Sequence, residues 1–304
     1  MQKIKFYSAL LILFFLITLI YVYNMSSEYS IKTPKETPTE SYKEKCMSLF
    51  RKLRYPDQKL VFRPPLKEPP ADMLKNFTQN GDLPMRRLWY FDNAYSDSDS
   101  LKKNDIKSIV TKEELNIWLD KIRKNLPLGY DDFSLKESMY SYADKLKDKT
   151  MVVIGTVSVW IEALSYELGC SKITTLDYTR RSYYDPSKFE WLHVNDYLDE
   201  AILNQIIENF DNAASFSSIE HAGLGRFGDQ LAPNGDVDAM QQVHCMLKPG
   251  SLFFLELPLD TTGVGYIEFN AHRVYGTKRL ALMFEGWRVV ARNRNIYILQ
   301  KVGV

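Results

Sequence analysis

TMVVIGTVSVWIEALSYELGCSKITTLDY, which spans residues 150–178, is the stretch that decides the fold. Its β-branched apolar residues run up to Gly155, apolar residues at helical spacing start at Trp160, and a second apolar run ends at Asp177. The pattern predicts a strand, a tight turn, a helix and a second strand, as in half of a βαβ nucleotide-binding unit. An acid at the end of the second strand can accept hydrogen bonds from both ribose hydroxyls of a nucleoside. We therefore expect Asp177 to bind ribose; the alternative is an ordinary strand-terminal acid in a turn.

The turn after the first strand carries one glycine, Gly155, which is followed by Thr156 and Ser158. The pyrophosphate of a dinucleotide needs close backbone approach at a helix N-terminus. One glycine supplies only the turn, so the pattern disfavours NAD and FAD and favours a cofactor without phosphates, such as S-adenosylmethionine. A second glycine pattern at 223–228 is followed by turn residues instead of a helix, which indicates a long loop rather than a dinucleotide site.

Strand and helix patterns keep alternating towards the C-terminus. The expected strands are 189–194, 213–219 and 252–257, and the expected helices are 198–210, 236–247 and 275–284, with a turn at 248–250. The last two strands, 287–291 and 295–301, lie too close for a helical crossover, so they should pair antiparallel. We expect an α/β domain over 131–304, with a mostly parallel sheet and helices on both faces.

Upstream of this domain, the segment 61–130 is expected to pack on it as an N-terminal extension. The aromatic cluster 88–91 is expected to be buried against the main domain. Capping boxes at Thr111 and Ser134, each followed three residues later by glutamate, predict helices to about residues 124 and 147.

The N-terminus carries an uncharged apolar run at 6–23, preceded by Lys3 and Lys5. Its length is near the lower limit for a bilayer span, roughly 17–25 residues, and no small-residue cleavage site follows. We expect a transmembrane signal anchor, a short cytoplasmic tail at 1–5 and a flexible stem at 24–60. The body should then be lumenal in the Golgi or endoplasmic reticulum; the opposite orientation would make it cytosolic. The sequons at Asn24 and Asn76 agree with a lumenal body.

Composition restricts the partners. The 39 basic and 38 acidic residues give a net charge of +1, without the basic stripe that nucleic-acid binding requires, so we expect no nucleic-acid partner. No histidine or cysteine cluster has zinc spacing, so no metal site is predicted. Of the three cysteines, Cys170 and Cys245 are expected to be buried free thiols. Cys46 lies near the stem, and a disulfide-linked dimer through it is a hypothesis.

Five segments occur in the order found in a known family. They are VVIG (152–155), TLDY (175–178), HVND (193–196), FDNAASFSSIEH (210–221) and LKPGSLFFLELP (247–258). Together they resemble class I S-adenosylmethionine-dependent methyltransferases over roughly residues 133–303. More narrowly, VSVWIEA and SSIEHAGLGRFGDQLAPNGD resemble a nematode-type family of membrane-anchored proteins of unknown function. The resemblance implies a Rossmann-like, seven-stranded sheet with an antiparallel last strand.

The resemblance also implies a site for S-adenosylmethionine. Its residues would be Gly155 and Thr156 beside the methionine part, Asp177 on the ribose, Asp196 near the adenine, and Ser217, Glu220 and His221 around the methyl-transfer centre. A histidine such as His221 can act as general base on an acceptor hydroxyl. The alternative is a structural histidine that bonds the loop backbone.

The sequence thus favours a membrane-anchored methyltransferase that acts on glycans or secreted proteins. One alternative is a non-catalytic binding or structural protein on a degenerate methyltransferase fold, because the family's glycines after Gly155 are missing. A glycosyltransferase is a further alternative, with Asp-x-Asp sequences at 97–99 and 236–238. Neither sequence directly follows a predicted strand.

Overall fold

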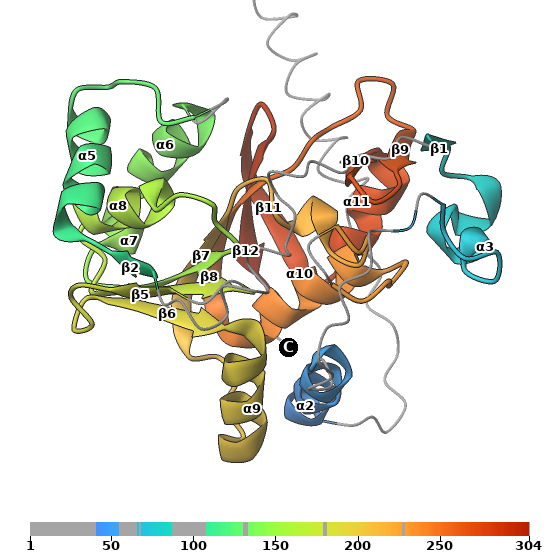
Figure 1. Cartoon of the computed structure of the whole chain (residues 1–304), viewed down its shortest axis with the longest axis horizontal. Coiled ribbons are helices and arrows are strands. Elements are labelled where there is room, and N and C mark those ends of the chain that lie inside the picture. The colour runs from blue at the N-terminus through green and yellow to red at the C-terminus, as the bar shows by residue number, and fades with distance from the viewer. Residues whose placement is uncertain are drawn as a thin grey trace, which may run out of the picture. The chain divides into compact units, whose positions relative to one another are not determined.

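A seven-stranded sheet in the order β11-β12-β8-β7-β3-β4-β6 forms the centre of the structure, a computed structural model (Figure 1). Its strands are β3 (Thr150–Ile154), β4 (Lys172–Asp177), β6 (Phe189–His193), β7 (Phe210–Ser215), β8 (Leu247–Glu256), β11 (Trp287–Asn293) and β12 (Ile296–Lys301). The five strands from β6 to β8 run parallel, and β12 pairs antiparallel with both β8 and β11. The predicted parallel sheet with a reversed last strand is confirmed.

The structure describes residues 41–54, 66, 68–86, 108–129, 133–178, 181–226 and 229–303. The predicted signal anchor at 6–23, the aromatic cluster 88–91 and the Asp-x-Asp sequence at 97–99 lie outside these residues. Within the described part, every helix is too short or too polar to cross a membrane.

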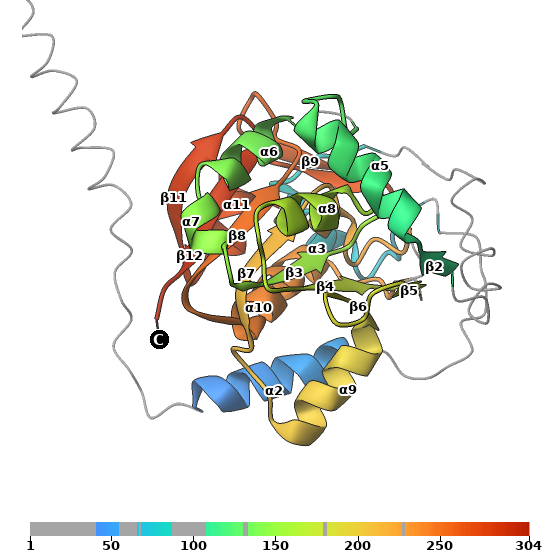
Figure 2. The same ribbon diagram turned by 90° about the vertical axis from the view of Figure 1, so that its left-hand side faces the viewer.

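Helices cover both faces of the sheet (Figures 1 and 2). One face carries α5 (Lys112–Arg123), α6 (Phe133–Tyr140), α7 (Ala143–Leu146) and α8 (Trp160–Glu167); the other carries α2 (Tyr42–Leu53), α9 (Val194–Asn204), α10 (Gly235–Met246) and α11 (Thr277–Met283). Side chains alternate along each strand. Met151 and Val153 therefore pack in the core under α5 to α8, whereas Val152 packs in the core under α2, α9, α10 and α11.

The extension adds strands to two small sheets, which shows how it packs on the main domain. It contains α3 (Leu74–Phe77), η1 (Gln79–Gly81), β1 (Met85–Arg86) and β2 (Ser108–Val110). β1 pairs with β9 (Gly265–Glu268), which pairs in turn with β10 (His272–Tyr275). β2 pairs with β5 (Arg181–Tyr183). Phe77 packs edge-on against Phe269 at 5.4 Å and closes a third apolar cluster.

Helix ends follow the local capping chemistry. Thr111 accepts a hydrogen bond from the N–H of Glu114 and caps α5 as predicted. Ser134 is instead buried inside α6, where its carbonyl accepts from the hydroxyl of Ser138, so the second capping box was wrong. His193 caps α9 through Nδ1, so this helix starts at Val194, earlier than the predicted residue 198. The expected turn at 248–250 belongs to β8.

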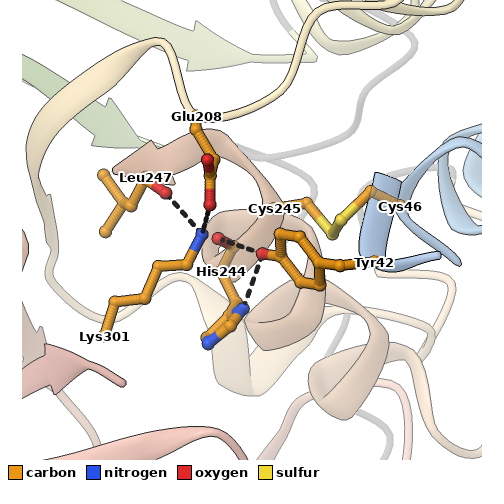
Figure 3. The surroundings of a disulfide bond; sticks show 7 residues. All are labelled: Tyr42, Cys46, Glu208, His244, Cys245, Leu247 and Lys301. Atoms are coloured by element: carbon orange, nitrogen blue, oxygen red, sulfur yellow. Dashed lines mark hydrogen bonds and ion pairs between the residues drawn. A yellow bond between two sulfur atoms is a disulfide. The ribbon is translucent and has the colours of Figure 1, made fainter. Parts of the chain in front are cut away.

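The structure corrects three predictions about Cys46, its helix and Cys245. Residues 42–53 were expected to be part of a flexible stem, but they form α2, which buries Cys46, Met47 and Phe50 on one face. Cys46 bonds to Cys245 of α10 in the same chain (Figure 3), so the predictions of an intermolecular bridge and of a free thiol at Cys245 were wrong. Apolar residues at 46, 47 and 50 with charged residues before and after them form the amphipathic pattern of α2, which was the available sequence signal. Cys170 is a buried free thiol, as expected.

Candidate functional site

The strand order reverses direction at β3. From β3 the chain passes through α8 to β4 on one side, whereas β7 lies on the other side of β3. In open α/β sheets, ligands bind outside the carboxyl ends of the strands at such a switch point. The loops after β3 and β7 meet here, and the hydroxyl of Ser215 donates to the carbonyl of Ile154 at 3.1 Å.

Asp177 ends β4 directly beside this point. Its Oδ2 accepts a hydrogen bond of 3.1 Å from the N–H of Thr156, in the turn after β3. The N–H of Gly155 donates to the carbonyl of Leu176 at 2.9 Å and aligns the two strand ends. The structure therefore brings together the three residues predicted to hold the nucleoside: Gly155, Thr156 and Asp177.

Gly155 is required by its neighbours. It has φ +64°, in the left-handed region, and an added Cβ would lie 2.0 Å from Oγ of Ser218. The space that glycine leaves is therefore filled by the loop after β7. On the other side of the turn, Val157 is 79% exposed, so the turn presents an apolar side chain at the rim of the site.

A second polar group follows β7. The N–H of Ser217 donates to Oε2 of Glu256 at 3.1 Å, and its hydroxyl donates to Oε1 of Glu220 at 2.7 Å. Glu220 is 1% exposed, and its Oε2 has no hydrogen-bond partner among the described residues. Burial raises the pKa of Glu220 to about 6. A buried carboxylate with an unused oxygen at a strand-end crevice is typical of a functional site.

His221 is oriented by the hairpin that follows β8. Its Nδ1 lies 2.6 Å from the carbonyl oxygen of Ala271. Because a carbonyl only accepts, Nδ1 carries the proton and Nε2 has the lone pair. Nε2 lies 3.6 Å from Oε1 of Glu220. Burial lowers the pKa of His221 to about 4, so the ring is neutral at pH 7.

His272 extends this group outwards. Its ring packs edge-on against His221 at 6.2 Å, and its Nε2 lies 3.3 Å from Oε2 of Glu268. His272 is the first residue of β10, which pairs antiparallel with β9 in a hairpin.

Asp196 comes three residues after the last residue of β6, on the helix that follows it. It is exposed in the first turn of α9. His193, the last residue of β6, stands opposite Asp177 in the register of β4 and β6. The end of β6 is thus next to Asp177, while Asp196 is exposed.

The described part of the glycine-rich stretch, residues 223–226, is a loop, as predicted, and buried arginines hold the segment around it. Arg273 is 1% exposed and donates to the carbonyl of Ala222 at 2.6 Å. Arg279 is ion-paired with Asp236, which is completely buried at the start of α10. The Asp-x-Asp sequence at 236–238 therefore has its first carboxylate inside the protein, where no exposed sugar-nucleotide metal site can use it.

A small cavity of about 50 Å³ opens between these strand ends. Its lining residues are Leu53, Tyr178, Val194, Ala222, Gly223, Ala232, Gly235, Asp238, Ala239 and Gln242. They follow β4, β6 and β7 in the chain, except for Leu53, which comes from α2. Sequence reasoning missed Leu53 because α2 was assigned to the stem.

A larger cavity, of about 280 Å³, lies at the opposite edge of the sheet. Thr150, Lys172 and Phe210 line it at the starts of their strands. Lys172 is paired there with Glu190 at 3.0 Å. Because catalytic groups of open α/β sheets gather at the carboxyl edge, this cavity is not part of the candidate site.

Several solved structures are similar to the chain at low identity. A 1,6-didemethyltoxoflavin-N1-methyltransferase of Burkholderia thailandensis, crystallised with S-adenosylhomocysteine, is 12% identical, with a TM-score of 0.43 over 62% of this chain and 87% of that one. The N-methyltransferase NodS of Bradyrhizobium japonicum is 14% identical, with a TM-score of 0.36 over 62% and 98% of the two chains. A methyltransferase of Mesorhizobium loti is 13% identical, with a TM-score of 0.38 over 57% and 98%.

These scores are low, so the assignment of a class I methyltransferase-like fold rests on the chain's own strand order and register. No curated protein matches the sequence. A family model does match it, over residues 148–295, which contain β3, the Gly155 turn, Asp177 and the whole Ser217–His221 group. The family that this model represents is described as "Caenorhabditis protein of unknown function, DUF268".

Proposed function

We propose that the domain is an S-adenosylmethionine-dependent methyltransferase. The observation that carries the proposal is the hydrogen bond between Asp177 and the Thr156 N–H at the switch point of the sheet. It holds an acid at the carboxyl end of β4, where ribose hydroxyls are bound in folds of this kind. The solved methyltransferases with S-adenosylhomocysteine agree with this choice of nucleoside.

The residues around the cavity suit a nucleoside without phosphates. Tyr178, Val194 and Leu53 offer apolar contacts to a base, and none of the residues that line the cavity is lysine or arginine. A pyrophosphate would have no cationic partner there. The cavity is smaller than a nucleoside, so we infer that binding of the cofactor would move its walls apart. When bound, the cofactor supplies a methyl group on a positively charged sulfur.

The role of His221 follows from its fixed tautomer. Ala271 holds the proton on Nδ1, so Nε2 is the atom that would accept the proton of an acceptor hydroxyl. Oε1 of Glu220, 3.6 Å from Nε2, would stabilise the imidazolium that forms. Glu220 is ionised at pH 7, since its pKa is about 6. We infer that His221 is the general base and that Glu220 and Ser217 position it.

The disulfide supports the proposed location. Disulfides persist in oxidising compartments and are rare in the cytosol. Cys46 and Cys245 join two buried helix faces in one chain, which supports a body in the secretory pathway behind the signal anchor expected at 6–23. Acceptors would then be glycans or secreted proteins, and S-adenosylmethionine would have to be imported into that compartment.

The second candidate is a non-catalytic protein on the same fold. It is favoured by one observation, namely that the side chain of Ser218 fills the space beside Gly155. A bound cofactor needs close backbone approach at such a turn. If the side chain of Ser218 does not move away from Gly155, the site would be closed to the methionine half of the cofactor.

Calorimetric titration with S-adenosylhomocysteine distinguishes the two candidates. We expect saturable binding by the full-length protein and loss of about 10-fold or more in affinity for Asp177→Ala, because a ribose would lose its charged acceptor. Asp120→Ala on the exposed surface of α5 is the control and should bind like the wild type. No binding by the wild type at millimolar ligand would leave the non-catalytic protein as the better explanation.

A further inference from the structure

The start of α2 is fastened to the end of α10 by several contacts (Figure 3). Cys46 is bonded to Cys245, and both side chains are buried. One turn earlier, the hydroxyl of Tyr42 lies 2.9 Å from Nδ1 of His244, and the ammonium of Lys301 lies 4.7 Å from the centre of the Tyr42 ring. This end of α2 is therefore held by a covalent bond, a hydrogen bond and a cation–π contact.

The other end of α2 reaches the carboxyl edge of the sheet. Phe50 is completely buried and packs edge-on against Tyr197 of α9 at 6.2 Å. Lys52 pairs at 2.7 Å with Asp238 in the first turn of α10. α10 runs antiparallel to the strands beside it, so its first turn lies at the edge where the candidate site is found.

The last residue of α2, Leu53, is part of the cavity wall. It faces the same 50 Å³ space as Tyr178 after β4, Val194 after β6 and Gly223 after β7. The other walls all come from the domain that carries the ribose acid. α2 thus supplies an apolar side chain to the crevice from a segment nearly 200 positions away from its disulfide partner.

We propose that α2 is a wall of the nucleoside crevice, with Leu53 as its contact residue, and that the Cys46–Cys245 bond holds this wall in place. The inference rests on the proposed function, since it assigns residues to the same ligand. A base that enters the crevice is packed between Leu53 and the residues after β4 and β6. Breaking the disulfide loosens the wall and weakens binding without touching Asp177.

The simpler explanation is that α2 only stabilises the domain. The two explanations differ at one position of the helix. Leu49 and Leu53 are both partly buried leucines on α2 that pack against the same core, but only Leu53 lines the cavity. If α2 only stabilises the domain, loss of either side chain should weaken ligand binding. If α2 is a wall of the crevice, loss of the Leu53 side chain alone should weaken it.

Calorimetry with S-adenosylhomocysteine on the full-length protein tests the assignment. We expect Leu53→Ala to weaken binding about fivefold to tenfold through lost apolar contact. Leu53→Trp, which fills the cavity, should abolish binding, and Leu49→Ala should bind like the wild type. Equal affinities for Leu53→Ala and the wild type, or equal losses for Leu53→Ala and Leu49→Ala, would overturn the proposal. Absence of binding by the wild type would overturn the proposed function and this inference together.

A second measurement uses the unaltered protein and so does not depend on whether the variants fold. If the disulfide strengthens binding of S-adenosylhomocysteine by some factor, the ligand must strengthen the disulfide by the same factor. We expect saturating ligand to shift the reduction of Cys46–Cys245 in a dithiothreitol titration, read by thiol labelling and mass spectrometry. We also expect the reduced protein to bind more weakly by the same factor. Wild-type binding without any shift in the reduction curve would contradict the role of the bond.

Discussion

The hydroxyl of Thr175 in β4 donates a hydrogen bond of 2.8 Å to Oε1 of Glu162 in α8, and both side chains are completely buried. The other oxygen of Glu162 has no partner among the described residues. Burial raises the pKa of this carboxyl from 4.5 to about 7. The folded protein therefore keeps this carboxyl protonated at mildly acidic pH, where the unfolded chain would release the proton.

Glu162 should make the protein less stable as the pH rises. The folded pKa lies above the unfolded one, so the contribution of the protonated group is fully present below about pH 4.5 and is lost as the pH rises towards 7. Glu162→Gln should remove that loss, up to ~3 kcal/mol of unfolding free energy between pH 5 and pH 8. Urea unfolding at both pH values checks it. The same pH dependence in Glu162→Gln and in the wild type would contradict this role.

Gly155→Ala should destabilise the domain by about 1–3 kcal/mol, because alanine at positive φ is strained and its Cβ meets Oγ of Ser218. Adding Ser218→Gly should recover only part of the loss, since it relieves the steric conflict and leaves the backbone strain. Thermal unfolding of the single and double variants measures both parts. Full recovery would mean that the backbone at Gly155 is not strained.

Arg279→Met should cost about 3–5 kcal/mol of stability, because it leaves Asp236 buried with one of its two cationic partners removed. Arg288→Met is the matched control, since Arg288 is exposed and, among the described residues, its side chain bonds Gln300. It should change stability by less than about 0.5 kcal/mol. Trypsin cleavage after Arg226, in the loop held by this ion pair, should become faster in the first variant only.

Cys46→Ala should destabilise the protein by roughly 2–5 kcal/mol, because the bond to Cys245 closes a loop with a sequence separation of 199 residues. Urea unfolding with and without reductant measures the effect. In the wild type, alkylation of the denatured, unreduced protein should label one thiol, that of Cys170, and a non-reducing gel should show monomer. A covalent dimer on that gel would contradict the bond within the chain.

The sheet could be predicted from sequence because each strand is marked by a local pattern of residues. The β-branched run before Gly155 and the acid at Asp177 fix two neighbouring strands, and the short gap before the last strand forces an antiparallel pair. The grouping of Gly155 and Thr156 with Asp177 followed from this order. Its pairing with Thr156 is a direct consequence of adjacent parallel strands.

The rest depended on contacts between distant segments. His272 approaches His221 only because the hairpin after β8 folds back over the end of β7. Leu53 reaches the crevice only because α2 packs on α9 and α10. No sequence pattern near residue 53 predicts that packing. Cys46 and Cys245 could not be paired from a count of three cysteines, which allows three single bonds within the chain.

The position of the disulfide also constrains how the protein is made. A chain that enters an oxidising compartment from its N-terminus exposes Cys46 first, Cys170 next and Cys245 last. Until residue 245 arrives, the thiol that Cys46 meets first is Cys170, which in the finished protein is buried in the core on the opposite face of the sheet. Correct assembly therefore requires either that Cys170 is folded away early or that a thiol–disulfide exchange catalyst undoes the wrong bond. α2 is thus among the first parts of the domain to be synthesised, and its covalent attachment to α10 is among the last steps of folding.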